Sequence, residues 1–118
     1  MSGATGYHAG LRAEDIVATD YTGRGYSEVA RRWRGQGGEI DLILRQGDTV
    51  IFTEVKKSKS FARAATRLGR RQMDRLIAAG SEFLATEPRG QLTDVRFDLA
   101  MVDAQGAVSV IENAFAEA

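Results

Sequence analysis

The segment Gly38-Glu39-Ile40-Asp41-Leu42-Ile43, followed after a short gap by Thr49-Val50-Ile51-Phe52-Thr53-Glu54-Val55-Lys56, carries the pattern that decides the fold. Isoleucine, leucine, valine and phenylalanine dominate both runs, and Gln46-Gly47-Asp48 lies between them. This pattern predicts a β-hairpin with strands over Glu39–Arg45 and Thr49–Lys56. Charged side chains lie at the ends of both strands. Because an unpaired buried charge is costly, these charges need partners, and a divalent metal beside a phosphate group would supply them.

The predicted register of this hairpin depends on its turn. A two-residue turn at Gly47-Asp48 is favoured, because glycine at the first central position suits type II′. Asp41 then lies directly opposite Glu54, and Glu39 lies opposite Lys56. Since side chains alternate between the two faces of a strand, all four charges are predicted on one face, at the end away from the turn. A longer turn would shift the register by one residue and separate the two acids.

The predicted pairing brings two carboxylates close together. Directly opposite Cβ atoms lie about 4.5–5.5 Å apart, so Asp41 and Glu54 would repel each other without a cation between them. A Mg²⁺ or Mn²⁺ ion bridging both, with the carbonyl oxygen of Val55 as a third ligand, would provide that charge. The opposite face of the hairpin is predicted to be almost wholly apolar and carries Ile40, Leu42, Leu44, Ile51, Thr53 and Val55.

The rest of the chain predicts a mixed α/β fold of one domain over residues 1–118, with helices on the faces of a central sheet. Residues 1–8 are small and polar, and are predicted to form a disordered tail. The remaining elements are predicted as a helix over Gly10–Tyr21, an edge strand over Tyr26–Arg34, a long helix over Phe61–Thr86, and strands over Val95–Val102 and Val108–Ile111. The order is therefore α-β-β-β-α-β-β.

Composition limits the possible chemistry. The chain has no cysteine and a single histidine, His8, so thiolate zinc sites and cysteine nucleophiles are excluded and a metal would rely on oxygen ligands. No apolar run reaches the length of about 20 residues that spans a bilayer, and no signal peptide pattern is present. These features predict a cytoplasmic protein without a membrane partner.

Charge is distributed unevenly although the net charge is zero. The segment from Lys56 to Arg75 contains eight basic residues and one acid, whereas the segment from Leu76 to the end contains seven acids and two arginines. A basic middle segment is typical of a surface that binds a polyanion, and a solvated helix face that keeps the protein soluble is the alternative. The predicted nucleic-acid contacts, mainly to the phosphate backbone, are Lys57, Lys59, Arg63, Arg67, Arg70, Arg71 and Arg34.

Two polar residues interrupt the apolar stripes of the predicted helices. Glu14 lies on the stripe of the first helix, and Gln72 lies between Leu68 and Leu76 on the stripe of the long helix. A polar group on a core-facing stripe needs a hydrogen-bonding partner. Both side chains could reach the charged end of the sheet, or each could form a capping or rim hydrogen bond.

The spacing of Asp41 and Glu54-Val55-Lys56 resembles the D-(x)n-E-x-K signature of the PD-(D/E)XK nuclease superfamily. Over about residues 10–115, the chain resembles the YraN family, whose small bacterial-type proteins are similar to Holliday-junction resolvases. The stretches that carry this resemblance are Gly38–Ile43, Glu54–Lys56, Ala13-Glu14, Trp33-Arg34, Arg96–Asp98 and Asn113–Phe115.

The resemblance implies a restriction-endonuclease-like core and a Mg²⁺- or Mn²⁺-dependent endonuclease that acts on DNA, with branched DNA as a substrate and a homodimer as the working form. Asp41 and Glu54 would bind the metal, and Lys56 would stabilise the attacking water or the phosphate. Glu14 would be an auxiliary acid, and Gln72 would match a polar position on the helix after the lysine strand.

The sequence departs from the family pattern at two places, which affects substrate binding more than the metal site. Lys57-Ser58-Lys59 follows Lys56 where the family has a Lys-x-Arg-like pair, and Arg70 or Arg71 replaces a lysine. Two other functions stay open: a catalytically silent nucleic-acid-binding module of the same fold, and a protein-interaction domain that uses the acidic C-terminal half.

Overall fold

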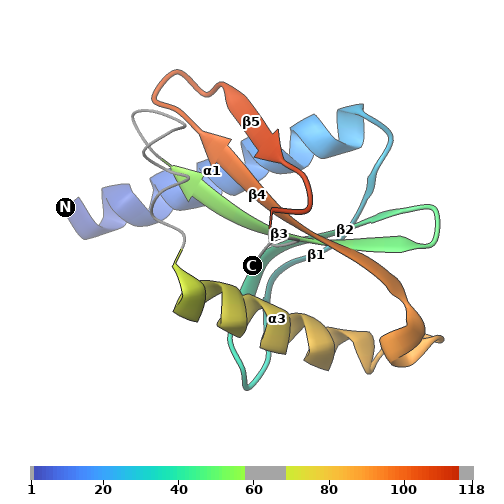
Figure 1. Cartoon of the computed structure of the whole chain (residues 1–118). Helices are drawn as coiled ribbons and strands as arrows, with labels where there is room; N and C mark the ends of the chain where they lie inside the picture. The colour runs from blue at the N-terminus through green and yellow to red at the C-terminus, as the bar shows by residue number, and fades with distance from the viewer. Residues whose placement is uncertain (1, 58–68, 115–118) are drawn as a thin grey trace.

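A mixed α/β fold is seen in the computed structural model, which describes residues 2–57 and 69–114 (Figure 1). The element order confirms the predicted fold class. The elements are α1 (Ser2–Gly23), β1 (Ser27–Arg34), β2 (Glu39–Gln46), β3 (Thr49–Lys57), α3 (Arg70–Leu84), a 3-10 turn (Gly90–Leu92), β4 (Asp94–Val102) and β5 (Val108–Ile111).

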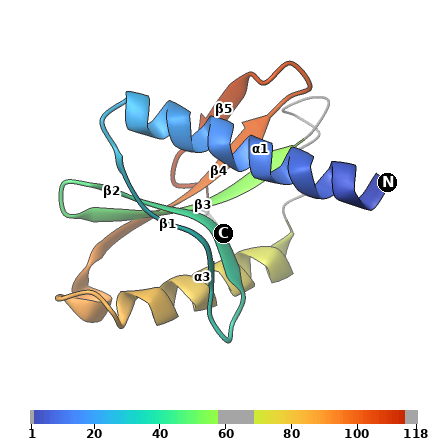
Figure 2. The ribbon, with the colours of Figure 1, turned by 180° about the vertical axis from the view of Figure 1, so that it is seen from behind.

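The five strands form one sheet in the order β1-β2-β3-β4-β5. Neighbouring strands are antiparallel except for β3 and β4, which are parallel. A parallel pair needs a crossover connection, and α3 lies in the segment that joins these two strands. Helix α1 covers one face of the sheet and α3 covers the other (Figures 1 and 2). Among the residues that the structure describes, no helix has both the length and the apolar character needed to cross a membrane.

Each face of the sheet has its own hydrophobic cluster. The cluster under α1 is built from Ala13, Val17, Ala18, Tyr21, Tyr26, Leu42, Leu44, Ile51, Ala100 and Val102. The cluster under α3 is built from Ile40, Ile43, Val50, Phe52, Leu76, Ala79, Phe83 and Leu84. From Leu42 onward, the alternation of β2 and β3 separates the two sets, because successive side chains point to opposite faces.

The predicted hairpin register is confirmed. Leu42 pairs with Thr53 and Ile43 with Phe52, as the turn at Gly47-Asp48 requires. Gly47 has a φ of 59°, whereas Asp48 is not in the positive-φ region, which is the pattern of a type II′ turn. The local chemistry of the turn therefore sets which residues of β2 and β3 face each other.

Both helices differ from their predicted limits. Helix α1 begins at Ser2 rather than Gly10, so it includes most of the segment that was predicted as a disordered tail. Extending an existing helix costs less than starting one, which lets a polar stretch continue the helix that packs on the sheet. Helix α3 ends at Leu84 rather than Thr86. The predicted first part of the long helix, over residues 61–68, lies outside the described residues.

The alternation of side chains is interrupted in β1, at a register shift near its start and again at Arg32, and in the first residues of β2. Arg32 has a φ of 49°, which is unusual for a residue with a side chain. Arg31 and Arg32 consequently both pair with acids of α1, and Trp33 packs in the α3 cluster. Its partner on β2, Ile40, also packs there. The prediction that Ile40 shares one face of the hairpin with Leu42 is therefore wrong.

A buried carboxylate joins α1, the sheet and the end of the described chain. Asp98 is fully buried and accepts two hydrogen bonds of 2.9 Å from the guanidinium of Arg96. The hydroxyl of Tyr21 donates to Asp98 at 2.7 Å, and Thr53 donates to the Tyr21 hydroxyl at 3.1 Å. The backbone N–H of Asn113 also donates to Asp98. Such a satisfied network stabilises a single arrangement of these elements.

Candidate functional site

The strands β2 and β3 separate at the end where the charges lie. Their paired ladder ends at Leu42 and Thr53. Beyond this point the backbone N–H of Val55 donates to the Oδ2 atom of Asp41 at 2.8 Å. A side-chain carboxylate thus takes the place of a backbone acceptor. The hydrogen bond fixes one oxygen of Asp41 against the strand that carries Glu54 and Lys56.

Glu54 lies beside Asp41 in a poorly solvated position. Its side chain is only 12% exposed. Burial, followed by the charge of Asp41 and a hydrogen bond with Asp41, raises the pKa of Glu54 to about 8. Glu54 is therefore largely protonated at neutral pH, as expected for a buried acid held close to another acid. A divalent cation would compete for the position of that proton.

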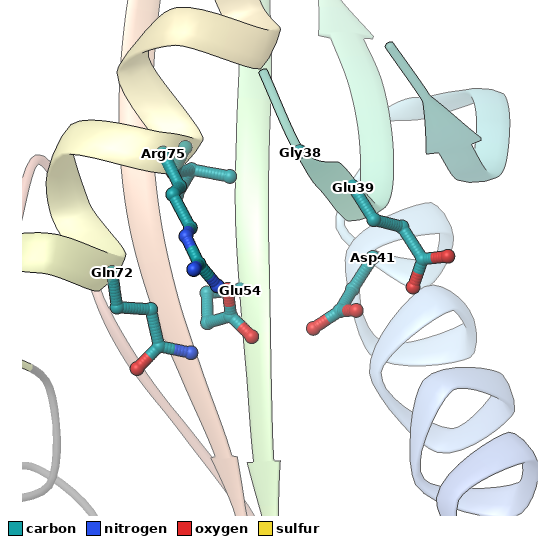
Figure 3. Close-up of a pocket in the computed structure, with 7 residues that line it drawn as sticks. Gly38, Glu39, Asp41, Glu54, Gln72 and Arg75 are labelled. Atoms are coloured by element: carbon teal, nitrogen blue, oxygen red, sulfur yellow. The ribbon is translucent and has the colours of Figure 1, made fainter. Parts of the chain in front are cut away.

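A pocket of about 230 Å³ opens next to these two acids. Its lining comes from the turn before β2, from β2 itself, from β3 and from α3, and consists of Gly38, Glu39, Asp41, Glu54, Gln72, Arg75 and Leu76. Figure 3 shows Gln72 and Arg75 projecting from α3 on one side, with Asp41 and Glu39 on the other side and Glu54 between them. The structure therefore brings Asp41, Glu54 and Gln72 together, although they come from three elements.

Lys56 lies next to Glu54 but outside the pocket lining. Its Nζ atom is 3.8 Å from Oε1 of Glu54, and its side chain is 23% exposed. The predicted register places Glu39 opposite Lys56. In the structure, Glu39 instead pairs with Arg34 at 2.9 Å. This pairing follows from the β1–β2 register, which places Arg34 directly opposite Glu39.

Glu14 is buried near this site and has another partner. Its carboxylate is 3.0 Å from the Nε atom of Arg32, and the residue is 6% exposed. Burial is the main cause that raises the pKa of Glu14, and the charges of Asp41 and Glu39 add to it. Glu14 does not belong to the pocket lining. The unusual backbone of Arg32 therefore turns a cation towards the acid that α1 buries.

The predicted nucleic-acid contacts divide into three groups. Arg70 and Arg71 are exposed in the first turn of α3, next to Gln72, and Lys57 is exposed at the end of β3. Arg34 is exposed but bonded to Glu39. The remaining three, Lys59, Arg63 and Arg67, lie outside the described residues. The described part of the basic segment thus lies at the end of the molecule that carries the pocket.

Two residues of α3 shape the site and were not singled out from the sequence. Glu82 accepts the backbone N–H groups of Gln36 and Gly37, at 2.8 and 2.6 Å. A Cβ atom on Gly37 would lie 2.9 Å from both this carboxylate and the Cβ of Ala78. Glu82 thereby holds the β1–β2 turn against α3. The other residue is Arg75, whose spacing of three from Gln72 is a helical signal for a shared face.

A metal ion at this site would have two carboxylate ligands, Asp41 and Glu54, rather than three. Within residues 2–57 and 69–114, no group of three histidine, aspartate or glutamate side chains is arranged to hold a metal ion. Asp41 and Glu54 nevertheless fit Mg²⁺, because this ion is commonly held by one or two carboxylates while waters and substrate phosphates complete its octahedron. The raised pKa of Glu54 supports this fit, since it marks a place where positive charge is needed.

Comparison with known proteins identifies the family. A model of the uncharacterised protein family UPF0102 matches residues 13–102. A UPF0102 protein of Cereibacter sphaeroides is 65% identical over 116 residues, covering 98% of this chain and 99% of the relative. A UPF0102 protein of Roseobacter denitrificans is 57% identical and covers 98% and 90%, and one of Dinoroseobacter shibae is 43% identical and covers 89% and 78%. The chain therefore belongs to the UPF0102 family of YraN-like proteins.

Proposed function

We propose that this protein is a metal-dependent endonuclease that hydrolyses DNA phosphodiester bonds. The observation that carries the proposal is the pair Asp41 and Glu54, which line one pocket where β2 and β3 separate, with the pKa of Glu54 raised by burial and by Asp41. Burying two adjacent acids is unfavourable without a cation. The resemblance of Asp41 and Glu54-Val55-Lys56 to the PD-(D/E)XK signature supports the same reading.

Asp41 and Glu54 would hold Mg²⁺ or Mn²⁺, with the carbonyl oxygen of Val55 as a third protein ligand. The hydrogen bond from Val55 N–H to Asp41 orients one carboxylate oxygen towards β3. Glu14 is bonded to Arg32, so we assign it an electrostatic effect on Asp41 rather than a place among the ligands. When bound, the metal would lower the pKa of a water molecule and neutralise charge on the phosphate.

The other residues of the site have roles that follow from their positions. Lys56 places an ammonium group beside Glu54, where it can stabilise the attacking water or the negative charge that develops on the phosphate. Gln72 offers an amide in the pocket, which can orient water or a phosphate oxygen. The exposed Arg70 and Arg71 would hold the neighbouring backbone.

DNA would be held by its backbone rather than by its bases. The pocket lining contains no aromatic side chain on which a base could stack, and stacking platforms are usual where single strands are bound through their bases. Contacts to phosphates do not read sequence. Branched DNA is the substrate that the family resemblance favours, and a homodimer would cut two strands.

A nuclease assay with a matched control tests the proposal. Labelled four-way junction, linear duplex and single-stranded DNA are incubated with the protein in Mn²⁺ or in EDTA. We expect cleavage only with metal, a loss of at least 100-fold for Asp41→Asn and for Lys56→Ala, and no change for Asp48→Asn, whose carboxylate is exposed in the distant β2–β3 turn. Metal-dependent cleavage that survives Asp41→Asn would show that a contaminant or another site is responsible.

A further inference from the structure

Arg75 forms the side of the pocket that faces the acids. It lies one helical turn after Gln72 on α3, and both residues line the pocket (Figure 3). The turn before β2 packs directly against its backbone, since a Cβ atom on Gly38 would be 3.4 Å from both the Cβ and the carbonyl oxygen of Arg75. Glu82 bonds the same turn two helical turns later. The distance between Arg75 and β2 is therefore set by contacts on the turn.

The acids of the pocket are bonded to groups other than Arg75. Glu39 pairs with Arg34, Asp41 accepts the Val55 N–H, and Glu54 lies 3.8 Å from the Nζ atom of Lys56. Although three carboxylates line the same pocket, no ion pair within 4.0 Å joins Arg75 to a carboxylate in the part of the chain that the structure describes. The guanidinium and the two central acids thus line one pocket without an ion pair of that length between them.

The arrangement suits a ligand with a negatively charged group. That group would contact the metal ion at Asp41 and Glu54 on one side and the guanidinium of Arg75 on the other. Arg75 is exposed and accessible, and a guanidinium presents its N–H donors in a fork that matches two phosphate oxygens. Lys56 cannot take this place from its present position, because it lies outside the pocket lining. Arg75 and Lys56 therefore have different positions relative to Glu54.

We infer that Arg75 binds the DNA phosphate that enters this pocket, as the group that positions it opposite Asp41 and Glu54. The inference rests on the proposed nuclease function and assigns within it a residue that the D-(x)n-E-x-K signature does not include. Lys56 then acts beside Glu54, while Arg75 contributes mainly to binding. Loss of Arg75 should raise KM more than it lowers kcat, and loss of Lys56 should do the opposite.

Binding is measured by fluorescence anisotropy with a labelled single-stranded oligonucleotide in Ca²⁺, so that the metal site is filled without relying on cleavage. A lost charge-assisted contact corresponds to an affinity about tenfold lower for Arg75→Ala. The slope of log K against log salt should fall by about 0.7, the value for one phosphate of a single strand. Arg75→Lys should restore the slope but only part of the affinity.

Arg89→Ala is the matched control, because this exposed arginine follows the far end of α3, and it should behave as the wild type does. Thermal melting checks that the Arg75 variants are folded. A wild-type protein that neither binds nor cleaves DNA would overturn the proposed function and this inference together. A wild-type protein that does both, with Arg75→Ala unchanged in affinity or in salt slope, would overturn the inference alone.

Discussion

Replacing Glu54 by glutamine should stabilise the metal-free protein at alkaline pH. Burial beside Asp41 raises the pKa of Glu54 to about 8 from an ordinary value of 4.5. Between about pH 4.5 and 8, the folded protein therefore binds a proton that the unfolded chain has released. The free energy of unfolding falls as the pH rises through this window, because stability decreases with pH wherever the folded state binds more protons. Above about pH 8 it levels off.

The size of this effect follows from the raised pKa. Each pKa unit corresponds to about 1.4 kcal/mol, so the whole window could amount to about 4–5 kcal/mol. Because the site can relax when Glu54 ionises, we expect about half of that, ~2 kcal/mol between about pH 5 and pH 9. A glutamine carries no charge, and its amide can still donate a hydrogen bond to Asp41.

Urea unfolding in EDTA measures this difference over the pH range. At about pH 5 the Glu54→Gln variant should match the wild type, and at about pH 9 it should be more stable by ~2 kcal/mol. Asp48→Asn, in the exposed turn, serves as the control for removing a carboxylate. If wild type and Glu54→Gln differ by the same amount at every pH, Glu54 does not titrate in this window and this account of the site is wrong.

Three further outcomes are expected. In a thermal shift assay, millimolar Mn²⁺ should raise the Tm of the wild type, since a ligand that binds only the folded state stabilises it. The Tm of Asp41→Asn should not change. An equal rise in both would place the metal elsewhere. Glu82→Ala should lower the free energy of unfolding by about 2 kcal/mol, because two backbone N–H groups lose a charged acceptor, and Glu82→Gln by about half as much in urea unfolding. Asp98→Ala should lower the free energy of unfolding by about 3–5 kcal/mol, because it leaves the half-buried Arg96 without its carboxylate. Tyr21→Phe should lower it by only about 1 kcal/mol. Similar losses for the two variants would show that the ion pair does not dominate this network.

Local features of the hairpin were predictable because they depend on neighbours in the sequence. Gly47 accepts a positive φ without a steric penalty, and a two-residue turn then sets the pairing of Leu42 with Thr53 and of Ile43 with Phe52. The same register places Asp41 and Glu54 at one end. Their presence in one pocket could be anticipated without knowing how the helices pack.

Contacts between distant segments were harder to predict. Glu82 and Gln36 are 46 positions apart, and no periodic pattern marks a carboxylate that will cap a turn. Arg32 shows the same limit in β1. Strict alternation would send it to the face opposite Arg31, but its positive φ turns it towards Glu14 on α1. In this conformation the guanidinium of Arg32 pairs with Glu14, an acid that α1 buries.

The chain alone thus specifies the two strands, their register and the convergence of Asp41 with Glu54, because turn chemistry and the period of two act over a few residues. The packing of α1 and α3 on opposite faces determines how those acids are used. This packing pairs Glu14 with Arg32 and places Gln72 and Arg75 along the pocket. It also excludes enough water to raise the pKa of Glu54. Desolvation and long-range pairing depend on the whole fold, and no short stretch of sequence contains them.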